Sequence, residues 1–177
     1  SLLAATSTWD NVCRITVSPD NSNIILAARR YGGIHRSTNG GVNWSVRLNA
    51  QGSFYVAFDP TDGNKAVGHI IDYDWGIGDW YHRAVYSTNG GFTWATASGD
   101  MSRQNGFGSR IELAYAPSSP NIVYASCATG GGRIWSSTDG GQSYTLQTGG
   151  GSSGVSWYAN PLWVDPTNPN FLVTGGY

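Results

Sequence analysis

The chain has 177 residues, of which 25 are glycine, 13% are aromatic and only 12% are charged. The net charge is −1 and Lys65 is the single lysine, which excludes the basic face that binding to nucleic acid or to an anionic membrane requires. No apolar run approaches the ~20 residues of a membrane-spanning helix, and no signal peptide is recognisable. We therefore expect no nucleic-acid partner and no membrane span.

Short apolar strands recur in pairs along the chain. In chain order the pairs cover residues 15–19 and 24–28, 56–60 and 65–70, 113–117 and 122–127, and 162–166 and 171–174. The first member of each pair ends in a proline, at Pro19, Pro60, Pro117 and Pro166. Proline presets φ, and the Asn and Asp residues that follow it tolerate left-handed backbone, so each pair is predicted to be two strands joined by a turn.

A second motif follows the first three pairs at a constant spacing of 50 residues, beginning at positions 37, 87 and 137. Its members are Ser37-Thr38-Asn39-Gly40-Gly41-Val42-Asn43-Trp44, Ser87-Thr88-Asn89-Gly90-Gly91-Phe92-Thr93-Trp94 and Ser137-Thr138-Asp139-Gly140-Gly141-Gln142-Ser143-Tyr144. We call each of them a box turn. The Asn or Asp side chain can accept backbone N–H groups, and the glycines take positive φ without a steric penalty. The serine, the Asn or Asp, the second glycine and the final aromatic residue are therefore assigned structural roles.

Together the two signals define a unit of strand, proline turn, strand, variable connection, strand, box turn and outer strand. This is a four-stranded antiparallel blade, and the predicted fold is an all-β propeller. The units cover about 10–50, 51–100, 107–150 and, incompletely, 155–177. Propellers use about four to eight blades of ~40–45 residues. About four blade equivalents with open ends predict an incomplete ring, as a fragment of a longer chain or part of an assembly.

The box turns, which follow the pattern Ser-x-Asp-x-Gly-x-x-Trp with Asn39 and Asn89 at two of the Asp positions, resemble the Asp-box (BNR) superfamily of propellers. That superfamily includes sialidases, xyloglucan-degrading hydrolases, sortilin-like receptors and photosystem II assembly factors. The sialidase motif Arg-Ile-Pro has its nearest match in Arg110-Ile111-Glu112, which lacks the proline. Xyloglucanases carry a catalytic aspartate where this chain reads Ala28-Arg29-Arg30-Tyr31-Gly32-Gly33, without one. The resemblance therefore favours branches other than sialidases, and it implies fold more strongly than activity.

The second unit is longer than the others by roughly nine residues, and this insertion falls within the stretch Ile71 to His82, between its second and third strands. In an up-and-down blade this connection lies on the same face as the long links between units, and that face is where propellers bind ligands. Aromatic rings stack on sugars, and guanidinium groups bond hydroxyls. The candidate ligand-binding residues are Tyr73, Trp75, Trp80, Tyr81, Arg29, Arg30, Tyr31, Arg103, Trp157 and Tyr158.

The clustered carboxylates Asp72, Asp74 and Asp79 are the candidate catalytic residues, because a pair of carboxylates can hydrolyse a glycosidic bond. Loop aspartates also serve as turn formers, and this alternative stays open. The three histidines, His35, His69 and His82, are expected to be structural. The two cysteines, Cys13 and Cys127, lie in different units and are expected to be buried thiols without a disulfide.

Three functions remain compatible with the sequence. The first is an extracellular or cell-surface propeller directed at a polysaccharide or oligosaccharide, as a hydrolase fragment or a carbohydrate-binding relative. The second is a non-catalytic propeller that binds a protein partner, or the remainder of its own ring. The third is a structural or adhesive repeat protein of a cell surface or virion. We expect no cofactor and no metal. The aromatic and acidic insertion favours the first.

Overall fold

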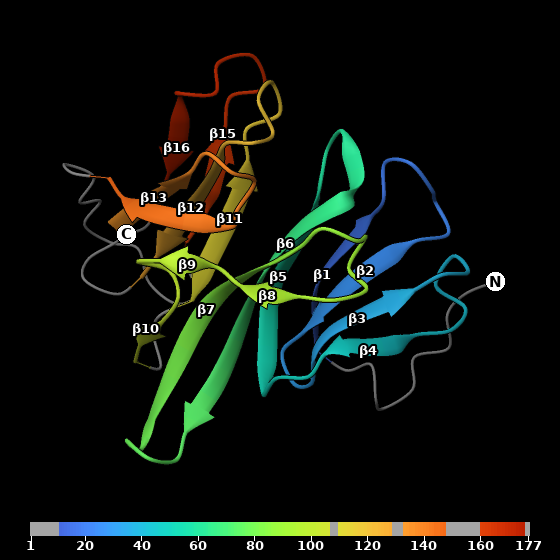
Figure 1. Ribbon diagram of the computed structural model, residues 1–177, viewed down its shortest axis with the longest axis horizontal. Coiled ribbons are helices and arrows are strands. Elements are labelled where there is room, and N and C mark those ends of the chain that lie inside the picture. The colour runs from blue at the N-terminus through green and yellow to red at the C-terminus, as the bar shows by residue number, and fades with distance from the viewer. Residues whose placement is uncertain (1–10, 107–109, 129–132, 148–159, 176–177) are drawn as a thin grey trace.

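The computed structural model describes residues 11–106, 110–128, 133–147 and 160–175 of the chain, and every regular element in these ranges is a β-strand (Figure 1). The first sheet consists of β1 (Val12–Val17), β2 (Ile25–Arg29), β3 (Gly33–Ser37) and β4 (Ser45–Leu48). Its strands are antiparallel and follow chain order. This is the blade that the sequence predicts. The described residues contain no helix that could cross a membrane.

The second sheet contains β5 (Gly52–Asp59), β6 (Asp62–Asp74) and β7 (Asp79–Ser87). Its outer strand is divided, whereas the sequence predicts one continuous strand. Two short strands, β8 (Ala95–Thr96) and β10 (Gln104–Asn105), pair with different parts of β7. Between them, β9 (Ser98–Gly99) leaves the sheet and pairs in parallel with β14 of the next one. Gly99 permits this crossing, since a Cβ there would lie next to the carbonyl oxygen of Tyr144.

The third sheet consists of β11 (Ile111–Tyr115), β12 (Val123–Cys127), β13 (Arg133–Ser137) and β14 (Ser143–Leu146), with β9 at its edge. The last two strands, β15 (Leu162–Val164) and β16 (Leu172–Thr174), form an antiparallel pair. The first strands of successive sheets contact one another in the order β1, β5, β11 and β15. This is the arrangement of a β-propeller, in which the first strand of each blade is the innermost, and the four sheets form part of a ring (Figure 1).

Three apolar clusters lie between consecutive blades. Leu26 and Ile34 of the first blade pack with Ile70 of the second, and Val67 of the second blade packs with Leu113 of the third. A smaller cluster joins the third blade to the last strand pair. Each fully buried aliphatic side chain of this kind contributes about 1.5–3 kcal/mol to folding. The blades are therefore held together by apolar packing of alternate residues on facing strands.

The box turns have the structural role that the sequence predicts. In the first, Ser37 Oγ accepts a hydrogen bond from Gly41 N at 2.8 Å, and Asn39 Oδ1 accepts one from Asn43 N at 2.8 Å. Trp44 folds back over the turn and donates its indole N–H to the Gly41 carbonyl at 2.8 Å. The turns that begin at Ser87 and Ser137 repeat the serine and Asn/Asp contacts. Asparagine can take the place of aspartate in the first two box turns, because the backbone N–H donors need only an oxygen acceptor.

The box turns also set the distance between blades. Gly91 in the second turn has φ +76°, and a Cβ there would lie 2.5 Å from Leu26 of the first blade. Gly141 in the third turn has φ +92°, and a Cβ there would lie 2.5 Å from Val67 of the second blade. In both cases the glycine is seated against a core side chain of the preceding blade. The repeated glycine is therefore required by packing as well as by backbone conformation.

The expectation of two buried cysteines is wrong for one of them. Cys127 on β12 is buried, but Cys13 on β1 is exposed, and no disulfide joins them. Cys13 lies at a register shift between β1 and β2. Ile15 and Val17, which share one face of β1, are also exposed. Among the described residues, no blade covers this face of the first sheet.

Substitution of Gly141 by alanine tests the packing role of the box turn, and Gly140 provides a matched control. Both glycines have positive φ, but a Cβ at Gly140 would meet nothing within 4 Å. Gly140→Ala should cost about 1–2 kcal/mol of unfolding free energy from backbone strain alone. Gly141→Ala should cost about 1–3 kcal/mol more, because its methyl group overpacks the core at Val67. Urea denaturation measures both, and equal losses would contradict the packing role.

Candidate functional site

The insertion of the second blade is a β-hairpin. Strands β6 and β7 continue in register to Asp74 and Asp79, and they extend beyond the neighbouring strands in Figure 1. The turn between them is closed by a hydrogen bond of 2.8 Å from Gly78 N to the Asp74 carbonyl. Gly78 has φ +73°, which a glycine adopts without strain. The insertion is thus placed rigidly by the same ladder that builds the blade.

The register of this hairpin separates its side chains onto two faces, since directly paired residues of antiparallel strands point to the same side. The pairs Asp72–Tyr81 and Asp74–Asp79 lie on one side, which we call the acidic face. The pairs Ile71–His82 and Tyr73–Trp80 lie on the other, which we call the aromatic face. The candidate catalytic residues and the candidate stacking residues are therefore on opposite sides of one ribbon, except for Tyr81.

The three aspartates of the acidic face are held by local contacts. Asp72 accepts a hydrogen bond from Gln51 N at 3.0 Å and forms an ion pair with Arg83 at 2.9 Å. Asp79 accepts a hydrogen bond from Trp80 N at 2.8 Å. These contacts match those of turn-forming and ion-paired carboxylates.

Asp74 closes the tip of the hairpin. Its Oδ1 accepts the Gly76 N–H at 2.9 Å, and its Oδ2 pairs with Arg103 at 3.0 Å. These two contacts hold the pKa of the Asp74 carboxyl below its ordinary value. Arg103 lies with its guanidinium carbon 4.1 Å from the centre of the Tyr81 ring. Arg103 and Tyr81, both predicted to bind ligand, therefore belong to the acidic face.

On the aromatic face, the half-buried rings of Tyr73 and Trp80 and the exposed ring of Trp75 form a cluster that we call the aromatic platform. The Tyr73 ring makes edge contacts with Trp75 at 4.8 Å and with Trp80 at 5.3 Å between ring centres. Trp75 is 84% exposed. Edge-to-face packing of this kind fixes ring orientation while leaving one ring face open.

The aromatic platform adjoins a cavity of about 250 Å³. The residues that line the cavity are Arg30, Tyr31, Gln51, Phe54, Ile71, Trp80, His82 and Arg110. Arg30, Tyr31 and Trp80 are among the predicted ligand-binding residues, and Trp80 belongs to both the platform and the cavity. None of the lining residues is an aspartate or glutamate.

A close approach of two backbones places Arg30 and Tyr31 at the cavity. The turn after β2 lies directly on β5, where a Cβ on Gly52 would clash with the Arg30 carbonyl oxygen. Arg30 N also donates to the Asn11 carbonyl at 3.0 Å, and Gly32 N donates to that of Gln51 at 3.3 Å. The neighbouring Arg29, also predicted to bind ligand, lies with Nη1 3.4 Å from His35 Nε2 and does not line the cavity.

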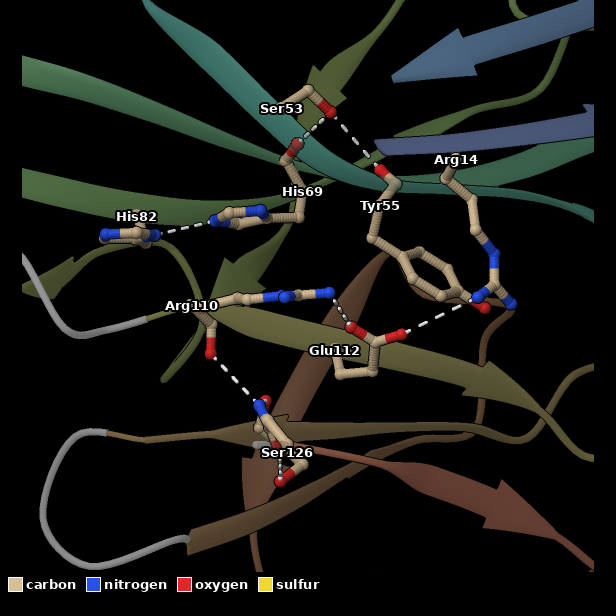
Figure 2. A network of polar contacts seen from close by, with 9 residues as sticks. Arg14, Ser53, Tyr55, His69, His82, Arg110, Glu112 and Ser126 are labelled. Carbon is tan, nitrogen blue, oxygen red and sulfur yellow. Dashed lines mark hydrogen bonds and ion pairs between the residues drawn. The ribbon is translucent and has the colours of Figure 1, made fainter. Parts of the chain in front are cut away.

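His82, which lines the cavity, forms a buried pair with His69 (Figure 2). His69 Nε2 and His82 Nδ1 are 2.7 Å apart, so one nitrogen donates a hydrogen and the other accepts it. The Phe54 ring stacks on His69 with 5.7 Å between centres. Burial, together with the nearby His82 and Arg110, holds the pKa of His69 well below its ordinary value. The structural role expected for His69 and His82 agrees with this geometry, and His82 in addition lines the cavity.

Arg110 lies beside the histidine pair, and Figure 2 shows its guanidinium group directed toward Glu112. Arg110 Nη2 is 3.1 Å from Glu112 Oε2, and Arg14 Nη1 is 4.0 Å from Oε1 of the same carboxylate. Burial raises the pKa of Glu112, and the two arginines oppose that change. The carbonyl of Arg110 accepts a hydrogen bond from Asn160 Nδ2 at 3.2 Å.

Sequence reasoning missed Phe54, Arg110 and Gln51 as cavity residues. Arg110 and Glu112 were compared only with a sialidase motif, although two charged residues at the start of an otherwise apolar strand are themselves a signal. Phe54 lies at a register shift of β5, which no local pattern reveals. The predicted residues Trp157 and Tyr158 lie outside the described residues. Within the described ranges, no group of three or more His, Cys, Asp or Glu residues could hold a metal ion.

No protein-family model and no curated protein matches this chain. Among solved structures, the GH74 enzyme of Niastella koreensis is similar over 81% of this chain and 23% of its own, with 22% identity and a TM-score of 0.55. The GH74 xyloglucanase of Xanthomonas campestris matches 93% of this chain and 35% of its own, with 17% identity and a TM-score of 0.40. YCF48 bound to D1 peptide matches 82% of this chain and 41% of its own, with 17% identity and a TM-score of 0.47. The chain thus spans less than half of each, and the first likeness supports the propeller fold alone.

The histidine pair predicts a dependence of stability on pH. The unfolded chain binds a proton at His69 near pH 6.5, whereas the folded chain does not, because the pKa of His69 is depressed. The unfolding free energy should therefore fall as the pH drops below about 6.5, by up to about 2 kcal/mol between pH 7 and pH 5 from this residue. In urea denaturation, His69→Gln should reduce the difference in unfolding free energy between pH 7 and pH 5. The raised pKa of Glu112 contributes equally to the wild-type protein and to the variant, so its effect cancels in this comparison. A difference of the same size in both proteins would contradict the role given to His69.

Proposed function

We propose that this chain is part of an Asp-box propeller that recognises a glycan, with the sugar lying on the aromatic platform and in the adjoining cavity. The observation that carries the proposal is the continuity of the two: Trp80 contacts Tyr73 of the platform and also lines the cavity. The three box turns, with their repeated hydrogen bonds, support the Asp-box assignment. An extracellular or cell-surface location belongs to the same proposal.

The chemistry of this surface suits a sugar. Exposed rings offer apolar faces on which pyranose rings stack. Trp75 of the platform and Tyr31 of the cavity lining are both exposed. Arg30, Gln51 and Arg110 supply hydrogen-bond donors along the cavity wall. A small cavity with predominantly apolar walls and a few polar groups is typical of small-ligand sites.

Binding is favoured over hydrolysis within this cavity. Glycoside hydrolysis uses two carboxyl groups on either side of the scissile bond. The described residues that line the cavity include no carboxyl group. Asp72, Asp74 and Asp79 lie on the opposite face of the hairpin in hydrogen bonds of their own. A polysaccharide-hydrolase function of a longer parent chain would therefore draw at least one of its carboxylates from outside this cavity.

A protein partner is the second candidate, and the tip of the hairpin favours it. Trp75 and Ile77 are both exposed there, and adjacent exposed apolar side chains are typical of surfaces that bind polypeptides. In that case the tip would be buried by the partner and the cavity would remain empty. The two candidates therefore differ in whether Trp75 acts together with the cavity residues or without them.

A glycan and polysaccharide array, followed by calorimetry with the best ligand, tests the proposal. Trp75→Ala should weaken binding about 2- to 10-fold, as expected from the ~0.5–1.5 kcal/mol that aromatic contacts contribute. Trp163→Ala is the matched control, because Trp163 is an exposed tryptophan on β15 in another blade and should leave binding unchanged.

Asp74→Asn separates binding from hydrolysis in the same assay, scored for the release of reducing ends. We expect it to leave glycan affinity unchanged and no reducing ends to be released by either protein. Release that is lost in Asp74→Asn would show that the acidic face is catalytic. A blank array, together with capture of a protein partner that depends on Trp75, would favour the second candidate.

A further inference from the structure

The described residues that line the cavity carry more positive than negative charge. This charge indicates which class of sugar the cavity would bind. Resting on the proposed glycan-binding function, we infer that the cavity binds an acidic sugar, whose carboxylate or sulfate group is held by Arg30 and Arg110. Among the residues that the structure describes, two guanidinium groups line the cavity and no carboxylate does.

Arg30 is available to a ligand. Its side chain is exposed and forms no ion pair with any of the described residues. Its contact is with the ring of Tyr31, at 5.5 Å from the guanidinium carbon. The backbone around it is fixed by the approach to Gly52 and by the hydrogen bond to Asn11. Arg30 is therefore a cation at the rim of the cavity whose position is set and whose charge is uncompensated.

Arg110 is only partly neutralised. Among the described residues its carboxylate partner is Glu112, which is shared with Arg14, so one negative charge faces two positive ones. Its Nε is buried and has no hydrogen-bond partner among the described residues. The guanidinium lies 5.5 Å from the centre of the Phe54 ring, which excludes water from that side. An anionic group in the cavity would balance the remaining charge.

The walls of the cavity strengthen this preference. Phe54, Ile71 and Trp80 make its surface mostly apolar, and a charge–charge contact is stronger in such surroundings than in water. A neutral sugar would strip water from the two guanidinium groups and return only weaker hydrogen bonds. A carboxylate or sulfate returns charge-assisted ones, which are roughly twice as strong. The adjacent His69–His82 pair adds no competing anion.

The test compares acidic oligosaccharides with neutral ones of the same backbone. The probes are oligogalacturonate and oligoglucuronate, their methyl esters, and a sulfated oligosaccharide, with affinity measured by calorimetry. Methyl esterification should weaken binding about tenfold or more, because it removes the charge that the arginines bind. A preference for the sulfated probe over the uronates would identify sulfate as the anionic group. Affinity for the acidic probes should fall as sodium chloride is raised.

Arg30→Gln should weaken binding of the acidic probe about tenfold and leave that of the methyl ester unchanged. Arg47→Gln is the matched control, since Arg47 packs on Phe92 away from the cavity and should leave both affinities unchanged. Arg30 lies on an exposed turn, so the variant keeps the Glu112 network intact.

The inference would be supported if the acidic probe binds more tightly than its methyl ester and if this preference is lost in Arg30→Gln. Equal affinity for acid and ester, with loss on Trp75→Ala, would overturn the inference and leave the proposed glycan function standing. No binding of any sugar, or binding of an acidic peptide alone, would overturn both.

Discussion

The fold depends on the contact between each box turn and the blade before it. The serine hydroxyl and the Asn or Asp oxygen replace the backbone partners that the turn would otherwise lack, so the glycine can be placed directly against a core side chain. Gly91 meets Leu26 and Gly141 meets Val67, one blade earlier in each case. The spacing of blades, and with it the width of the site between them, follows from these contacts. The apolar clusters then stabilise an arrangement that the turns have already restricted.

The candidate site arises from a small departure from this repeat. Additional residues in the second blade extend an existing antiparallel ladder, and the alternation of side chains along that ladder separates carboxylates from aromatic rings. One side presents rings that continue into a cavity, and the other presents aspartates already bound to arginines and backbone N–H groups. The proposed binding surface and the aspartates with structural contacts thus lie on opposite faces of one hairpin. The cavity is completed by residues of the first and third blades, Arg30 and Arg110.

Features that are local in sequence were predicted, and features that depend on packing between blades were not. The proline turns, the box turns and the position of the insertion are all local, and all were found from residue patterns. Asp72 and Trp80 lie on opposite faces because of the strand register, which the sequence does not reveal. Arg110, Phe54 and His69 come together only because two blades pack against each other, so this contact could not be predicted either. The expectation of a buried Cys13 is wrong, because this residue is exposed at a register shift of β1.

The cavity beside Trp80 is where we propose that this molecule holds an acidic sugar. A crystal structure of the protein soaked with a uronate oligosaccharide, chosen as the tightest binder, tests this proposal. We expect an anionic group between the guanidinium groups of Arg30 and Arg110, with a sugar ring against Trp80. A sugar bound on the acidic face beside Asp74, or an empty cavity at saturating ligand, would contradict it.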